Sequence, residues 1–163
     1  MNANLKNELI EVFTGQITRS VRATFTELTA KFGPSVKGVA NSRQYHVWAE
    51  TVRPCCERSS SRMSATYSLS EQRLAAFAAA LSADMADDVL AKVNAKVGEL
   101  GNAEAHRVHG ADFVITGTKH GHEVRIEQNQ IINCSVMGKL FNQYPSRIYV
   151  DGKFTPAAQF ADI

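Results

Sequence analysis

The spacing of apolar residues changes once along this chain of 163 residues, near Gly101, and the change limits the possible folds. Before Gly101, apolar residues recur at steps of three and four, which is the spacing of an amphipathic α-helix. After it, apolar and polar residues alternate, which is typical of strands with one buried and one wet face. Helices first and strands after, rather than alternating units, predict an α+β fold.

Two long helices are predicted in the first part. The first covers residues 4 to about 32, and Gly33-Pro34 ends it because glycine can form a left-handed cap and proline cannot continue a helix. The second is amphipathic, follows the N-cap residue Ser70 and covers about residues 71–99. Its apolar stripe comprises Leu74, Phe77, Leu81, Met85, Val89, Leu90, Val93 and Val97.

The second part predicts an antiparallel sheet built mainly from residues 111 to 155. Residues 113–116 and 123–127 are expected as strands across a turn at residues 117–121, and residues 131–137 are a further strand candidate. The clearest hairpin joins residues 147–150 to 153–155 through Asp151-Gly152, because Asp-Gly supplies the two positive-φ positions of a type I′ turn. We expect a single domain, residues 1–163, with both helices packed on this meander with hairpins.

Length and composition limit the protein class. A chain of 163 residues supports one core, and 44% hydrophobic with 21% charged residues is ordinary for a soluble globular domain. No apolar run approaches the ~20 residues that span a bilayer, and residues 1–8 lack a secretory signal, so we expect no membrane and a cytoplasmic protein. Adjacent Cys55 and Cys56 rarely bridge each other, which agrees with a reducing compartment.

The segment from Arg19 to Arg62 is basic. It has eight Lys or Arg and three Glu, a net charge of +5, whereas the whole chain carries +2. Its second part, about residues 34–69, is expected to be a long and mobile loop region, with a solvated Ser59-Ser60-Ser61 stretch. Residues 45–52 fit either a short strand or one helical turn; a strand would place Tyr45 on the face opposite Trp48.

Cations beside flat rings are typical of nucleic-acid binding, because cations replace condensed counterions on phosphates and rings stack on bases. No RNP, KH, zinc-finger or recognition-helix pattern is present, which favours single strands bound with little sequence preference. DNA and RNA both remain open, as does the choice between Trp48 and Tyr45 as the stacking ring. The predicted binding residues are Lys37, Arg43, Tyr45, Trp48, Arg53, Arg58, Arg62, Arg147 and Lys153.

Other chemistry has little support in the sequence. The chain has no nucleophile elbow, no P-loop and no dinucleotide fingerprint, so we expect no enzyme and no cofactor. His120 and His122 are two residues apart and could ligate zinc together with Cys55 and Cys56, but no Cys-x-x-Cys pair supports this. Surface histidines are the favoured interpretation, and no metal is predicted.

Residues Glu127–Asn133 and Gly138–Phe154 resemble small phage-encoded proteins. The whole chain is similar in length and order to the early single-stranded-DNA-binding cofactors of bacteriophages that carry a giant virion RNA polymerase. The resemblance implies a single-stranded-DNA-binding protein that assists early transcription by the phage RNA polymerase in the host cytoplasm. It supplies no signature residues.

The alternative is a non-enzymatic phage or bacterial protein that binds and modulates another protein through the basic loop or an acidic helix patch. That patch consists of Asp84, Asp87 and Asp88, which otherwise form a solvated helix face. The long first helix could serve as a core helix or a dimer element, so a homo-oligomer also stays open.

Overall fold

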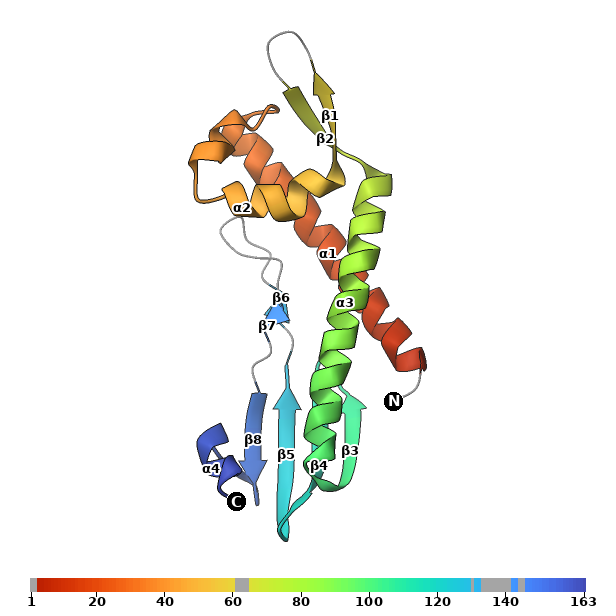
Figure 1. Cartoon of the computed structure of the whole chain (residues 1–163), viewed down its shortest axis with the longest axis vertical. Coiled ribbons are helices and arrows are strands. Elements are labelled where there is room, and N and C mark those ends of the chain that lie inside the picture. The colour runs from red at the N-terminus through yellow and green to blue at the C-terminus, as the bar shows by residue number, and fades with distance from the viewer. Residues whose placement is uncertain (1–2, 61–64, 130, 133–141, 144–145) are drawn as a thin grey trace. The chain divides into compact units, whose positions relative to one another are not determined.

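The computed structural model describes residues 3–60, 65–129, 131–132, 142–143 and 146–163 (Figure 1). They form two compact units. The sheet unit consists of the described parts of Met1–Val12, Asp84–Ile131 and Asn142–Ile163, and the hairpin unit of those of Phe13–Ala83 and Ile132–Phe141. A single domain stays our expectation, because each long helix is continuous through residues of both units.

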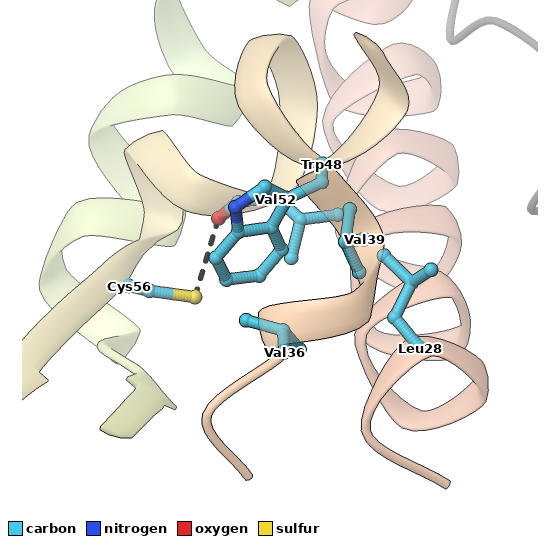
Figure 2. Close-up of a cluster of buried hydrophobic side chains, with 6 residues drawn as sticks. All are labelled: Leu28, Val36, Val39, Trp48, Val52 and Cys56. Atoms are coloured by element: carbon cyan, nitrogen blue, oxygen red, sulfur yellow. Dashed lines mark hydrogen bonds between the residues drawn. The ribbon is translucent and has the colours of Figure 1, made fainter. Parts of the chain in front are cut away.

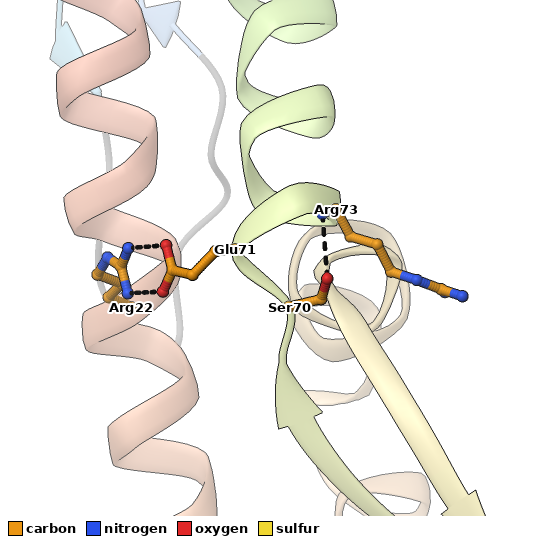
Figure 3. Close-up of polar contacts among 4 residues, drawn as sticks. All are labelled: Arg22, Ser70, Glu71 and Arg73. Carbon is orange, nitrogen blue, oxygen red and sulfur yellow. Dashed lines mark hydrogen bonds and ion pairs between the residues drawn. The ribbon is translucent and has the colours of Figure 1, made fainter.

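Both predicted helices are confirmed. α1 spans Ala3–Phe32, and Gly33 follows it with φ 82° while its N–H donates to Thr29 O (2.9 Å). α3 spans Glu71–Gly98, and Ser70 caps it: the Arg73 backbone N–H donates to Ser70 Oγ (3.2 Å; Figure 3). No helix among the described residues is long and apolar enough to cross a membrane.

The buried stripe of α3 is rotated slightly from the predicted one. Leu74, Ala78 and Ser82 are buried, whereas Phe77 and Leu81 are only half-buried. Small side chains bring α1 and α3 close together here, since Thr14 Oγ1 of α1 donates to Ser82 Oγ (2.9 Å). The bulky residues chosen from the sequence therefore flank this contact.

The sheet unit holds a five-stranded antiparallel sheet in the order β3-β4-β5-β8-β9. The strands are β3 (Gly101–Arg107), β4 (Phe113–Lys119), β5 (His122–Gln128), β8 (Ser146–Val150) and β9 (Lys153–Phe154). The turn expected at residues 117–121 is shorter, because β4 continues to Lys119 and only His120 and Gly121 turn, with φ 50° and 83°. The β8–β9 hairpin is confirmed, with φ 49° at Asp151 and 79° at Gly152.

β3 is an edge strand that the sequence did not predict, because Ala103 and Ala105 are its only apolar residues. Two short strands, β6 (Ile131–Ile132) and β7 (Asn142–Gln143), form a separate ribbon. Residues 133–137 of the predicted strand 131–137 lie outside the described residues. α4 (Ala157–Ala161) ends the chain's regular structure.

One face of this sheet forms the core of the sheet unit. The C-terminal half of α3 runs along the strands and overlies β4 (Figure 1). Its residues Met85, Val89 and Val93 are buried, and so is one face of the sheet. That face carries Phe113, Ile115, Val124, Ile126, Ile148 and Val150, and Ile115, Ile126 and Ile148 are paired across three neighbouring strands.

In the hairpin unit, the described residues of the region 34–69 are folded and do not form a long loop. It comprises η1 (Lys37–Asn41), α2 (Tyr45–Val47), η2 (Trp48–Val52), η3 (Arg53–Cys55) and the antiparallel strands β1 (Cys56–Ser60) and β2 (Ala65–Leu69). The helical option for residues 45–52 is confirmed and the strand option is wrong. Ser59 and Ser60 belong to a strand, not to a loop.

An apolar cluster holds this region together. Its buried members are Leu28, Val36, Val39, Trp48, Val52 and Cys56 (Figure 2). Phe25, Phe32, Tyr67 and Leu69 pack against it from α1 and β2. The cluster was not predicted from the sequence, because its members come from several short elements and their apolar residues share no regular spacing.

Ile115→Ala should destabilise the protein by about 2–5 kcal/mol, because Ile115 is fully buried and the truncation leaves a cavity. Urea unfolding followed by circular dichroism measures the loss. The matched control is Val114→Ala on the other face of β4, where the side chain is only half-buried. Equal losses for the two variants would show that the buried face of β4 is assigned incorrectly.

Candidate nucleic-acid interface

The two units differ in charge. The described residues of the hairpin unit include eight Lys or Arg and four Glu, a net charge of +4. Those of the sheet unit include eight Lys or Arg and twelve Asp or Glu, a net charge of −4. The net charge is therefore positive on the hairpin unit and negative on the sheet unit, although the whole chain is nearly neutral. An anionic polymer is attracted to a unit with a net positive charge.

Four of the predicted cations lie on the surface of the hairpin unit. Lys37 lies in η1, Arg43 precedes α2, Arg53 begins η3 and Arg58 lies in β1; all four are exposed. None of these four forms an ion pair with a carboxylate among the described residues. Their charges are available to a ligand.

Of the other twelve described Lys and Arg, five have a carboxylate partner. In the sheet unit, Lys6 Nζ lies 2.7 Å from Asp87 Oδ1, and Arg107 Nε lies 3.3 Å from Glu8 Oε2. In the hairpin unit, both terminal nitrogens of Arg22 donate to Glu71, one of them over 2.7 Å (Figure 3). This bidentate pair raises the pKa of Arg22 and lowers the pKa of Glu71. Between residues 37 and 58, all four Lys and Arg thus lack a carboxylate partner among the described residues, whereas five of the twelve described elsewhere have one.

The β1–β2 hairpin places Arg58 beside a ring. Arg58 is directly opposite Tyr67, so their side chains share a face. The opposite face carries Ser59 and Ser68, whose exposed hydroxyls can donate to phosphate oxygens. The sequence analysis did not predict this pairing, although the alternation in residues 65–69 was a signal for β2. Arg62 lies outside the described residues.

The two candidate stacking rings differ in their exposure to solvent. Trp48 is 5% exposed and packs edge-on against Tyr67, with ring centroids 4.8 Å apart. Tyr45 is 39% exposed and lies beside His46. Trp48 is therefore part of the apolar cluster, and Tyr45 is the ring with a surface open to a base.

Arg147 and Lys153 lie in the sheet unit and do not share a face. Arg147 is opposite Glu127 on the outer face of the sheet. Lys153 is opposite Val150, whose side chain is buried, so Lys153 lies on the other side of the sheet. The structure does not bring these two cations together into one path, and Glu127 opposes the charge of Arg147.

The described histidines and cysteines are not brought together. No cluster of three or more His, Cys, Asp or Glu suited to a metal occurs among the described residues. His122 Nδ1 instead lies 2.7 Å from Asp151 Oδ2, and this hydrogen bond, with one from the Glu123 backbone, lowers the pKa of Asp151. His122 and Asp151 thereby join two turns of the sheet.

Cys55 and Cys56 are free, buried thiols. Cys55 Sγ donates to Thr51 O and Cys56 Sγ to Val52 O, both over 3.3 Å (Figure 2 shows the second). Burial raises the pKa of Cys55 to about 12, with a smaller contribution from Cys56, and burial raises the pKa of Cys56 to about 11. Neither thiol is an activated nucleophile, because the thiolate is the reactive form.

Known proteins supply no further assignment. No family model matches the chain, and comparisons with curated proteins and with solved structures find no match.

The free energy of unfolding should fall as the pH rises from about 9 to about 11. In the unfolded chain the thiols ionise near their ordinary pKa of 9.0, whereas in the folded chain they keep their protons up to a pKa of about 11 or 12. Stability from this difference is complete below pH 9 and is lost through this window, by at most about 1.4 kcal/mol per pH unit for each thiol.

Urea unfolding at three pH values in this window measures the slope. The control is the double variant Cys55→Ala with Cys56→Ala, which lacks the contribution of these two thiols. The same slope in both proteins would contradict the burial of the thiols.

Proposed function

We propose that the protein binds single-stranded nucleic acid through the hairpin unit and has no enzymatic activity. One observation carries the proposal: Lys37, Arg43, Arg53 and Arg58 are exposed and have no carboxylate partner within the part of the chain that the structure describes, in a unit whose described residues carry a net charge of +4. DNA is the expected strand, because the C-terminal sequence resembles single-stranded-DNA-binding phage cofactors.

Phosphate contact supplies most of the affinity in this proposal. Each cation that neutralises a phosphate releases a condensed counterion, which stabilises the complex at low salt. The sheet unit, with its net charge of −4, disfavours the same polymer. The strand is therefore expected along residues 37–58 and not along Arg147 and Lys153.

Stacking on Tyr45 supplies a second contribution. The ring is partly exposed and belongs to the same segment, residues 37–58, as the cations, whereas Trp48 is enclosed. A flat ring accepts any base, which agrees with the absence of a sequence-reading helix pattern. Little sequence preference is expected.

A role in early phage transcription, with the phage RNA polymerase as partner, is the further proposal that rests on the resemblance of residues 127–133 and 138–154. The second candidate function is binding to another protein. It is favoured by the acidic sheet unit and by Phe154, a large apolar side chain that is 63% exposed. Salt separates the two candidates, since only phosphate binding follows the counterion law.

Arg53→Ala combined with Arg58→Ala should weaken binding to every sequence and reduce the slope of log K against log[salt] by about 1.4, since each phosphate contact on a single strand contributes about 0.7. Fluorescence anisotropy with labelled oligo-dT at several salt concentrations measures both quantities. Duplex DNA provides the comparison for strand preference.

The control for this prediction is Lys6→Ala combined with Arg107→Ala. It removes the same charge from cations that already have carboxylate partners. Affinity and slope should remain near those of the unchanged protein. No binding of oligo-dT at low salt would exclude the proposed function.

Tyr45→Ala should cost about 1–3 kcal/mol of binding free energy and leave the salt slope unchanged, because stacking releases few counterions. Tyr149→Ala, in the sheet unit, is the matched control and should have no effect on oligo-dT binding. The emission of Trp48 should not change on DNA binding, because the indole is only 5% exposed. Quenching of Trp48 by oligo-dT would show instead that a base reaches the indole.

A further inference from the structure

α3 packs on the inner face of the five-stranded sheet and does not cover the outer face. Its central row crosses all five strands, because Glu104 pairs with Thr116, Thr116 with Arg125, Arg125 with Tyr149 and Tyr149 with Phe154. Side chains directly opposite on neighbouring strands stand on one face. The row therefore forms a continuous surface from one edge of the sheet to the other.

A groove of about 770 Å³ lies along this row. Glu104, Thr116, Arg125 and Tyr149 line it, together with Glu123 and Glu127 from β5. The volume falls in the range of ligand-binding clefts. A concave surface built from regular strands is also well ordered, which lowers the entropy lost on binding.

The groove is acidic. Arg125 Nη2 donates to Glu127 Oε1 (3.3 Å), so these two charges largely cancel. Glu104 has only His106 at 3.4 Å, and the Glu123 carboxylate forms no ion pair among the described residues. Two carboxylates therefore remain to attract a cationic ligand.

An aromatic pair extends the groove at one edge of the sheet. Tyr149 and Phe154 meet edge-on, with ring centroids 6.1 Å apart, and Phe154 is 63% exposed. Exposed rings bind guanidinium and ammonium groups through their faces. Carboxylates and rings in one groove are complementary to arginine and lysine side chains and repel a phosphate strand.

We propose that this groove binds an extended arginine- or lysine-bearing segment of a partner protein, independently of nucleic-acid binding by the hairpin unit. The partner's cations pair with Glu104 and Glu123, and a cationic or aromatic group contacts Tyr149 and Phe154. Four strand spacings of about 4.8 Å make a row that about six extended residues can cross. One chain would then connect an anionic strand and a basic protein through separate surfaces.

The test measures binding of a fluorescein-labelled (Gly-Arg)₄ peptide by anisotropy at low salt. Alternation places every arginine on one side of an extended chain. Glu104→Gln combined with Glu123→Gln should weaken binding by about fivefold, in keeping with two exposed ion pairs. Phe154→Ala should weaken it by about threefold through loss of a cation–ring contact. A (Gly-Glu)₄ peptide should not bind.

The control is Glu50→Gln combined with Glu57→Gln in the hairpin unit, which changes the net charge equally at exposed carboxylates. Peptide affinity should then change by less than about twofold. Equal losses in the two double variants would overturn the proposal, because binding would follow net charge alone. Absence of peptide binding would overturn it as well.

Sedimentation at low salt tests the other occupant, a second copy of the chain. If the unchanged protein dimerises and Glu104→Gln with Glu123→Gln abolishes the dimer, the groove binds a second copy of the chain. That outcome would overturn the proposal of a partner protein. Oligo-dT binding by the same variant should be unchanged. A negative result for peptide binding in the groove can thus be distinguished from a negative result for nucleic-acid binding by the hairpin unit.

Discussion

The hairpin unit depends on the burial of one indole. Trp48 is the largest side chain of a region made of short helical turns and two strands, none of which is stable alone. Its ring contacts Tyr67 of β2 and belongs to a cluster with Leu28 of α1 and Val39 of η1. Because these elements share one core, the exposed residues between them are held at definite positions.

The same core determines which charged residues of this region face outward. Residues 37–58 alternate between buried apolar side chains and exposed polar ones over irregular turns. Apolar burial determines which residues face outward, and most of those that carry charge are Lys or Arg. The long α1 and α3 helices and the sheet instead place Lys6, Arg107 and Arg125 within reach of a carboxylate. Charge separation between the units thus follows from local geometry as well as from composition.

The two proposals assign opposite charge preferences to two surfaces. In them, the exposed cations and Tyr45 bind a single strand, and the groove of the sheet unit binds a basic segment. Electrostatic repulsion would then keep each ligand away from the other surface, which favours specificity. This separation agrees with a protein that contacts a nucleic acid and a protein at once, and it gives the candidate functions different mutational signatures.

Periodicity by itself determined the α+β class, the two long helices and the Asp151-Gly152 hairpin, because repeating patterns and turn residues act over a few neighbouring positions. Local charge, not periodicity, predicted Lys37, Arg43, Arg53 and Arg58 as binding residues, and the structure places all four on the surface. Long-range packing decided what local patterns could not: that Trp48 is buried while Tyr45 is open, that Ser59 lies in a strand, and that Lys153 and Arg147 lie on opposite faces. Those outcomes depend on contacts between residues distant in the chain, for which local patterns carry no signal.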